Sequence, residues 1–362
     1  MAGSKTGWTS DYEGNKAMRL ATEAELARWD ELIEANPDGG NSLQTKTWGD
    51  FKAKFGWKPQ RFIYELKDRS IAVQMLVRSI PVFGDIWYCP KGPGVATVAD
   101  FQEIVTQTAK FKPQAIFVRF EPELLDDEVK KPQLSKVGLV RATRDSSSKS
   151  TIFIDLSAGE EAVLASFSQS ARRNIRKSAA AEVTVVPVEA TEGNLDTMFE
   201  LMKATEARAH YGLRSKEYFQ TYWKAQIEVG QAQLFFTKHE NDVLAGIFVT
   251  FVGKRAWYKD GGSFDIKREL QPTYLMQWEV MHWLMERGIT SYDMVGVPNR
   301  DEIGTGNSRD GLYEFKSKFN SDVTEFMGAW DLPTSPKYRL WNKLGERLAA
   351  RHARKQPEKF LY

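Results

Sequence analysis

The sequence has few of the residues that common catalytic and metal sites depend on. Its 362 residues include one cysteine, Cys89, so no disulfide can form within the chain, which fits a reducing compartment. The four histidines are far apart, and none has a carboxylate or thiol at the spacing of metal ligands. No P-loop, nucleophile elbow or dinucleotide-binding glycine motif is found. Zinc, redox and P-loop chemistry therefore have little support, and we expect no cofactor.

Long hydrophobic runs are also missing. The longest, AIFV and IFVTFV, are far below the roughly 20 residues of a transmembrane helix, and the first residues lack the apolar core of a signal peptide. The net charge is only +2, so a nucleic-acid partner would have to be held by local patches of positive charge. Because 42% of the residues are hydrophobic, the chain can build well-packed cores. We expect a cytoplasmic protein.

The length and the pattern of strands and helices favour two domains of the mixed α/β (α+β) class. Residues 1–18 are polar and aperiodic, as is typical of a disordered tail. A polar stretch before TIFIDL places the domain boundary near residue 155. We predict a first domain formed by residues 19–155 together with 332–362, and a second domain formed by residues 156–331.

Several segments give specific local predictions. Residues 22–35 are expected to form one helix capped by Thr22, and residues 160–181 another. In GLYEFKSKFN, residues 311–320, aromatic residues alternate with charged ones, which predicts a strand. From Ser335 onward, basic residues recur every four positions beside a leucine stripe, which predicts an amphipathic helix that packs back on the first domain.

Two patches of positive charge are candidate nucleic-acid contacts. The first lies within two turns of the helix at 160–181, in a stretch (162–181) without any acidic residue; it consists of Arg172, Arg173, Arg176 and Lys177. The second, residues 337–355, has seven Lys or Arg and one acid. The alternative for the first patch is a solvated helix face. For the second patch it is contact with an anionic membrane surface.

The strand order around WYKDGGS, followed by a helix and another strand, resembles the core of the GNAT acyltransferase fold. GNAT enzymes that use acetyl-CoA have a glycine-rich loop at the start of that helix, and its backbone N–H groups bind the pyrophosphate. Here the corresponding residues, SFDIKRELQPTYL, contain no glycine. The sequence therefore indicates a GNAT-like body that lacks the coenzyme loop.

A GNAT-like body without this loop, present twice, resembles the FemABX family of aminoacyl-tRNA-dependent transferases. The stretches LQTKTWGDFKAKFGW, FVRFEPE, SFSQSARRNIRKSAAAEVTV, RAHYGLRSKEYF, WYKDGGS and GLYEFKSKF occur in family order over residues 20–335. The second half is not interrupted by a coiled-coil arm, so the chain is more similar to FemX, which lacks this arm, than to FemA. The resemblance implies a monomer that transfers an amino acid from aminoacyl-tRNA to the stem peptide of UDP-MurNAc-pentapeptide or lipid II, building the interpeptide bridge of peptidoglycan. A conventional acyl-CoA-dependent N-acyltransferase and a non-catalytic binder of tRNA or precursor are the alternatives.

The resemblance also implies substrate-binding roles in the second half of the chain. Arg214, in GLRSKEYF, matches the arginine that contacts the phosphates of the precursor, and a guanidinium suits a diphosphate because it donates two parallel hydrogen bonds. Tyr218 follows one helical turn later, so both residues can face one ligand. Tyr258, in WYKDGGS, matches a tyrosine that packs on the substrate. An ordinary surface arginine and core tyrosines are the alternatives.

Two further candidates for substrate binding lie in the first half. Lys52, in WGDFK, matches a lysine that reaches the substrate, with Lys54 as the alternative in a neighbouring register. Glu121, in FEP, stands where the family usually has an aspartate that contacts the substrate.

The catalytic candidates implied by the resemblance are Phe315 and Lys316, with Lys318 as a solvated neighbour. In the reaction, an amine attacks the ester that links the amino acid to tRNA, and a protonated Lys316 would stabilise the negative charge on the carbonyl oxygen. No histidine or cysteine constellation offers an evident base. We therefore expect proton transfer to be assisted by the substrate or carried out by a carboxylate that the sequence does not identify.

Overall fold

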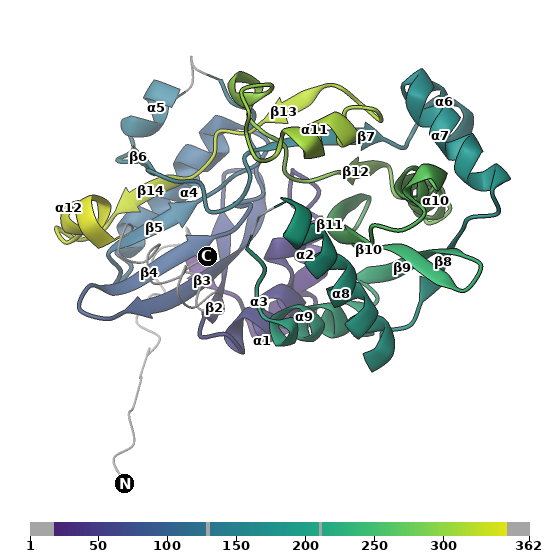
Figure 1. Ribbon diagram of the computed structural model, residues 1–362. Helices are drawn as coiled ribbons and strands as arrows, with labels where there is room; N and C mark the ends of the chain where they lie inside the picture. Colours follow the sequence, from purple (N-terminus) through teal and green to yellow (C-terminus); the bar gives the residue numbers. More distant parts are fainter. Residues whose placement is uncertain (1–17, 128–130, 210–211, 346–362) are drawn as a thin grey trace, which may run out of the picture.

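The computed structural model describes residues 18–127, 131–209 and 212–345, which form two seven-stranded mixed sheets flanked by helices (Figure 1). The first sheet has the order β1-β2-β3-β4-β5-β14-β6 and the second β13-β7-β12-β11-β10-β9-β8. The strands of the first sheet are β1 (Met18–Leu20), β2 (Lys58–Glu65), β3 (Ser70–Ile80), β4 (Gly84–Cys89), β5 (Phe117–Phe120), β6 (Val140–Arg141) and β14 (Trp330–Pro333). Those of the second are β7 (Ser150–Asp155), β8 (Thr184–Val188), β9 (Ala232–His239), β10 (Asp242–Val252), β11 (Arg255–Ser263), β12 (Ser291–Asp293) and β13 (Val323–Glu325).

The same arrangement occurs once in each sheet. β2, β3 and β4 are antiparallel neighbours, and α4 (Val98–Phe111) then connects β4 to the parallel strand β5. In the second sheet, β9, β10 and β11 are antiparallel, and α10 (Pro272–Met285) connects β11 to the parallel strand β12. The chain is therefore built from two similar α/β units.

The remaining helices lie at the ends of these units and between them. They are α1 (Glu23–Ala27), α2 (Trp29–Glu34), α3 (Lys46–Ala53), α5 (Lys131–Ser135), α6 (Glu160–Ser166), α7 (Gln169–Ala180), α8 (Glu192–Ala209), α9 (Lys216–Glu228), α11 (Asp310–Lys316) and α12 (Tyr338–Leu340). Short 3₁₀ turns lie at Ser42–Gln44, Arg268–Leu270 and Arg300–Glu302, and a π-helical turn at Trp341–Gly345. Within the described residues, no helix combines the length and the apolar character needed to cross a bilayer.

The chain passes from the first sheet to the second between β6 and β7, and it returns through β14, which lies between β5 and β6. A buried ion pair holds the returning strand, because Arg119 on β5 donates to Asp331 on β14 at 2.7 and 2.9 Å. The division into domains near residue 155 stays a prediction. Residues 1–17 of the expected tail lie outside the described residues, and Met18 begins β1.

Aromatic side chains join the two halves. On α3, Trp48 and Phe51 pack against Tyr218 and Tyr222 of α9, with ring centroids 4.8–5.3 Å apart. These side chains belong to one buried cluster together with Leu234 and other residues of the second sheet. The surfaces of the two halves that face each other are therefore fixed by a shared core.

The predicted strand at residues 311–320 is wrong. Residues 310–316 form the helix α11, and a turn follows. The side chains that face inward are Phe315, Lys316 and Phe319, of which Lys316 and Phe319 are buried. Their spacing, with Leu312, is i, i+3, i+4 and i+7, which is the helical repeat. The sequence concealed this repeat because one of its buried positions is a lysine.

Both long predicted helices are interrupted. The helix expected at 22–35 divides into α1 and α2 at Arg28, whose φ and ψ are −118° and 31°. The helix expected at 160–181 divides at Phe167, which is extended and buried, and Ser168 then caps α7 by accepting from the Ala171 N–H at 3.2 Å. Of the expected basic helix, α12 and the turn Trp341–Gly345 are described, while residues 346–362 lie outside the described residues.

Candidate active site

A cleft of about 800 Å³ lies between the two halves and is lined by residues of both. The first half contributes α3, the end of β4 and the segment 146–148, and the second half contributes β11, α11 and the loop before α9. Figure 1 shows α3, α9 and β11 together where the two sheets meet. The resemblance implies substrate-binding or catalytic roles for seven residues. Six of them line the cleft, namely Lys52, Arg214, Tyr218, Tyr258, Phe315 and Lys316.

Lys316 is buried at the wall of the cleft, with 5% of its surface exposed. Its ammonium donates hydrogen bonds to the carbonyl oxygens of Val295 and Gly296 and lies 5.4 Å from the ring centroid of Tyr258. Burial lowers the pKa of Lys316 to about 8, although the nearby Asp293 carboxylate opposes this change. At neutral pH the side chain is therefore mostly protonated, and it keeps one N–H beyond those used by the two carbonyls.

An unusual backbone turn presents these two carbonyls to Lys316. Val295 has a φ of 51° and Gly296 a φ of 59°. Such a φ is strained for a β-branched residue and persists only where the surroundings impose it. The Asp293 carboxylate accepts from the Val295 N–H at 2.7 Å and thereby fixes the turn. The sequence SYDMVG thus ends β12 and builds one side of the lysine site.

A second group of cations lines the cleft around Tyr218. The guanidinium of Arg214 lies 4.5 Å from the ring centroid of Tyr218, and the Nζ of Lys52 is 3.4 Å from the Tyr218 hydroxyl. Burial holds the pKa of Lys52 well below its ordinary value, and the charges of Arg214, Arg78 and Lys259 lower it further. Among the described residues, Lys52 has no carboxylate within ion-pair distance. This part of the cleft therefore brings several cationic side chains close together.

The comparisons with known proteins agree with the resemblance seen in the sequence. The model of the FemAB family matches residues 138–226 and 220–345, more than half of the chain. The chain belongs to the FemAB family.

Individual relatives extend this likeness beyond the matched residues. The lipid II:glycine glycyltransferase of Staphylococcus haemolyticus (strain JCSC1435) is 23% identical over 402 aligned positions, which cover 88% of this FemAB chain and 94% of the relative. Because 402 positions exceed the 362 residues of this chain, the relative has segments in the aligned region that this chain lacks. The crystal structure of FemX superposes with a TM-score of 0.78 at 20% identity, covering 90% of this chain and 99% of FemX. A tandem GNAT protein from the clavulanic acid pathway superposes with a TM-score of 0.50 at 10% identity, covering 88% and 98%. The GNAT-like fold is thus confirmed.

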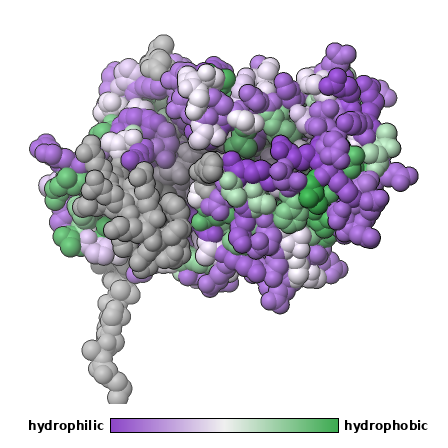
Figure 2. All heavy atoms as spheres, viewed as in Figure 1, coloured by the Kyte–Doolittle hydropathy of each residue, from purple (hydrophilic) through white to green (hydrophobic). Residues whose placement is uncertain are grey.

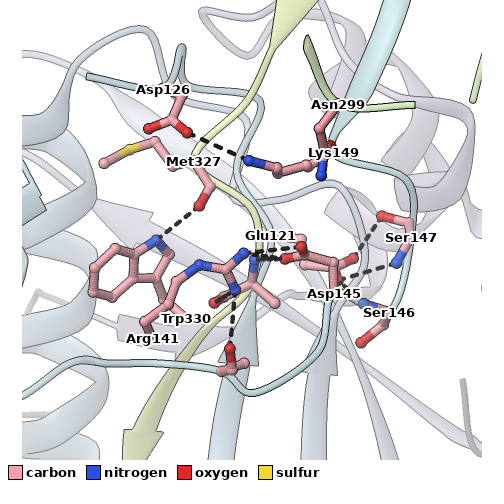
Figure 3. Close-up of polar contacts among 12 residues, drawn as sticks. Glu121, Asp126, Arg141, Asp145, Ser146, Ser147, Lys149, Asn299, Met327 and Trp330 are labelled. Carbon is pink, nitrogen blue, oxygen red and sulfur yellow. Dashed lines mark hydrogen bonds and ion pairs between the residues drawn. The ribbon is translucent and has the colours of Figure 1, made fainter. Parts of the chain in front are cut away.

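Glu121 lies beneath the wall of the cleft of this FemAB protein and is not one of its lining residues. Its carboxylate accepts from the Tyr88 hydroxyl at 2.7 Å, and from the Ser146 N–H and the Ser147 hydroxyl at 2.7 and 2.8 Å. Figure 3 shows Glu121 facing the two serines, next to the ion pair of Arg141 and Asp145. All three partners of Glu121 line the cleft, so the carboxylate holds the wall in place. A direct substrate contact of Glu121 stays a prediction.

The basic patch on α7 does not line the cleft. Arg173, Arg176 and Lys177 are exposed on α7. Arg172 is half-buried and donates to the carbonyl oxygens of Ala165, in α6, and Phe167, between α6 and α7. Figure 2 shows a strongly hydrophilic surface over α6 and α7, at the upper right. The role of this patch in tRNA binding stays a prediction. Lys54, the alternative to Lys52, is exposed and does not line the cleft.

The structure adds charged residues that the sequence did not single out. Lys259 and Asp260, on β11, line the cleft, and burial lowers the pKa of Lys259 and raises that of Asp260. Asp293, at the end of β12, and Arg309, before α11, line it near Lys316. The signal that could have found Lys259 and Asp260 is the charged pair inside WYKDGGS, where a strand of a central sheet normally carries apolar residues.

A further polar group joins the halves at the side of the cleft. Glu123, in the first half, accepts from Arg255 of β11 at 2.7 Å, and Arg255 also donates to the carbonyls of Asp38 and Gly40 at 3.0 and 2.8 Å. Burial raises the pKa of Asp38 to about 6 despite the nearby Arg255. In the described part of the chain, no group of three His, Cys, Asp or Glu side chains is placed to hold a metal ion.

Proposed function

We propose that this FemAB protein transfers an amino acid from an aminoacyl-tRNA to the stem-peptide amine of a peptidoglycan precursor, either UDP-MurNAc-pentapeptide or lipid II. The observation that carries the proposal is the buried ammonium of Lys316 at the wall of a cleft shared by both halves. The relative named a lipid II:glycine glycyltransferase, aligned over 88% of the chain, supports the precursor as acceptor.

The cations around Tyr218 suit the diphosphate of such a precursor. Both UDP-MurNAc-pentapeptide and lipid II carry a diphosphate, and Arg214 can bind it through two parallel hydrogen bonds. Each of Lys52, Lys259 and Arg214 has a lowered pKa, caused first by burial. A bound diphosphate would place negative charge beside these three side chains, and this attraction would contribute to binding.

Lys316 suits the chemistry of ester aminolysis. When the amine attacks the ester carbonyl, negative charge develops on the carbonyl oxygen, and a cation fixed beside it stabilises that charge without reorganisation. With a pKa of about 8, about nine in ten Lys316 side chains are protonated at pH 7. The carbonyls of Val295 and Gly296 hold the ammonium in position, and the ring of Tyr258 packs beside it.

Two basic surfaces outside the cleft, on α7 and around α12, are proposed contacts for the larger substrates. The exposed arginines of α7 would bind tRNA phosphates without reading bases. At the opposite end, Leu340 and Leu344 are about half-exposed next to Arg339 and Lys343, and Val82 lies fully exposed on the neighbouring hairpin. Leucines beside basic residues suit the anionic inner surface of a membrane, where a lipid-linked precursor would lie.

The acyl-CoA-dependent alternative has one observation in its favour, the superposition with a tandem GNAT protein. The site of the coenzyme loop argues against it. Between β11 and α10, residues 264–271 contain no glycine, and α10 begins with Pro272, which has no N–H to offer a pyrophosphate. We therefore favour aminoacyl-tRNA as the donor.

The deciding experiment incubates the protein with a pool of charged tRNAs and, in separate reactions, UDP-MurNAc-pentapeptide or lipid II in detergent. We expect the mass of one precursor to rise by that of one or more amino acid residues, and the mass also identifies the amino acid. Calorimetry with acetyl-CoA is the control. Micromolar binding of acetyl-CoA without a mass change in the presence of charged tRNA would favour the alternative, and binding of precursor without any transfer would indicate a non-catalytic binder.

A further inference from the structure

One carboxylate of the cleft is unused by the reaction as described so far. Asp293 has 5% of its surface exposed and lines the cleft close to Lys316. Its Oδ1 accepts from the Thr151 hydroxyl and from the Val295 N–H. Within the described residues, Oδ2 has no hydrogen-bond partner, and it is not fully shielded from solvent. This oxygen is therefore an acceptor that faces the cleft.

The proposed reaction needs such an acceptor. The attacking amine loses a proton as the amide forms, and the ribose oxygen gains one as it leaves. No histidine lines the described cleft. Glu123 is paired with Arg255, and Glu121 lies beneath the wall. Asp260 accepts from the indole N–H of Trp223 and lies beside Lys259, whereas Asp293 is the carboxylate that acts on the charge of Lys316. Asp293 is the lining carboxylate nearest in the chain to the carbonyls that hold Lys316.

We infer that Asp293 is the general base of this site and that the same carboxylate fixes the turn that positions Lys316. This inference rests on the proposed function and adds a catalytic residue to it. One oxygen, Oδ1, is committed to the turn, and the other, Oδ2, serves the substrate. The division explains why a β-branched residue is held at a φ of 51° directly beside the reacting groups.

In this reaction Asp293 takes up the proton that the amine loses and returns it to the ribose oxygen. The neutral stem-peptide amine attacks the ester carbonyl carbon, a C–N bond forms, and the carbonyl electron pair moves to oxygen beside the Lys316 ammonium. The amine proton passes to Oδ2 of Asp293. When the tetrahedral intermediate collapses, the C–O bond to the ribose breaks, and protonated Asp293 gives its proton to the departing ribose oxygen. The products are an amide and uncharged tRNA, and Asp293 is again ionised.

The surroundings of Asp293 suit a base. Burial raises its pKa above the ordinary 3.8, and the neighbouring Glu123 carboxylate raises it further, while Thr151 and Lys91 oppose the change. The other charged groups around it are Lys316 on α11 and Arg255 on β11. A carboxylate with a raised pKa accepts a proton more readily and stays ionised at neutral pH as long as its pKa lies below 7.

The first test replaces Asp293 by asparagine, which keeps the Oδ1 acceptor for the Val295 N–H. We expect kcat to fall by about 10²- to 10⁴-fold, with the precursor affinity measured by calorimetry unchanged within about twofold. The acidic limb of the pH–rate profile is expected to disappear. Because the Asp293 charge raises the pKa of Lys316, the basic limb should also move to lower pH. Asp301→Asn, at an exposed aspartate, is the matched control and should retain wild-type kinetics.

The second variant keeps the carboxylate and changes its environment. Thr151→Val removes the hydroxyl that donates to Oδ1 and keeps the shape of the side chain on β7. Because that hydrogen bond lowers the pKa of Asp293, its loss should move the acidic limb to higher pH. If Asp293→Asn does not fold, this shift decides the question, because a purely structural aspartate would leave the limb in place.

The outcomes separate this inference from the proposed function. A wild-type protein without aminoacyl transfer would overturn the proposed function and this inference with it. A wild-type protein that transfers, together with an Asp293→Asn variant of similar kcat and an unchanged acidic limb in Thr151→Val, would overturn the inference alone.

Discussion

Replacing Lys316 by methionine removes the charge and leaves a flexible side chain of similar length. Two of the three N–H groups of Lys316 are directed at the carbonyls of Val295 and Gly296, which leaves one for the carbonyl oxygen of the reacting ester. The loss of one such donor costs about 10²–10³ in kcat, or about 3–4 kcal/mol. We expect a loss of this size in Lys316→Met under single-turnover conditions, with little change in precursor affinity.

Lys318 offers a matched control two residues later. It lies on the same segment but does not line the cleft. Lys318→Met should keep kcat within about twofold, because the same change of charge occurs away from the reacting groups. A Lys316→Met protein that is folded and transfers at the wild-type rate would refute the catalytic role of the ammonium, and equal losses in both variants would assign the effect to net charge.

The same substitution has a signature in stability. An ordinary lysine has a pKa of 10.5, and burial lowers that of Lys316 to about 8. Between these values the unfolded chain binds a proton that the folded chain does not, so the free energy of unfolding rises with pH through this window, by at most about 3 kcal/mol. Lys316→Met lacks this dependence. When the pH is lowered from 10 to 7, the free energy of unfolding of the wild type in urea should therefore fall by up to about 3 kcal/mol relative to that of the variant.

Three further results are expected. Arg214→Gln should weaken precursor binding in calorimetry by about 10- to 100-fold, because it removes charge-assisted hydrogen bonds worth about 1.5–3 kcal/mol, and an unchanged affinity would remove Arg214 from the diphosphate site. Arg119→Met leaves the buried Asp331 carboxylate with the Tyr338 hydroxyl but without a cation, and should lower the free energy of unfolding in urea by about 3–5 kcal/mol. Adding Asp331→Leu should restore much of it, and a single variant of wild-type stability would contradict the account. Glutamine at the α7 arginines should flatten the dependence of tRNA affinity on salt by about one unit of log–log slope for each phosphate that the protein no longer neutralises, whereas the same slope would exclude this patch from the interface. The arginines concerned are Arg172, Arg173 and Arg176.

Local patterns in the sequence predicted the start of one helix correctly. Thr22 caps α1 as expected, although the helix expected at 22–35 is interrupted at Arg28. Where prediction failed, a tertiary contact had replaced a local rule. The segment expected as a strand at 311–320 contains the helix α11. The prediction failed because Lys316 is buried, and a lysine is rarely found at a buried position of a helix.

The candidate site could be predicted only in part. The resemblance drew attention to Lys52, Arg214 and Lys316, which the fold brings to one cleft. Asp293 carried no signal, because it is a single charged residue at the end of a short strand, and its contacts are with partners far along the chain. The hydrogen bond between Thr151 and Asp293, for example, joins residues 142 positions apart.

The most direct measurement follows the fate of an amino acid that is isotopically labelled and esterified to tRNA, in one reaction that also contains the precursor and unlabelled acetyl-CoA. The account predicts that the label appears in an amide on the precursor, at a rate that falls about 10²- to 10³-fold in Lys316→Met. Label that stays on tRNA while the precursor becomes acetylated would contradict it.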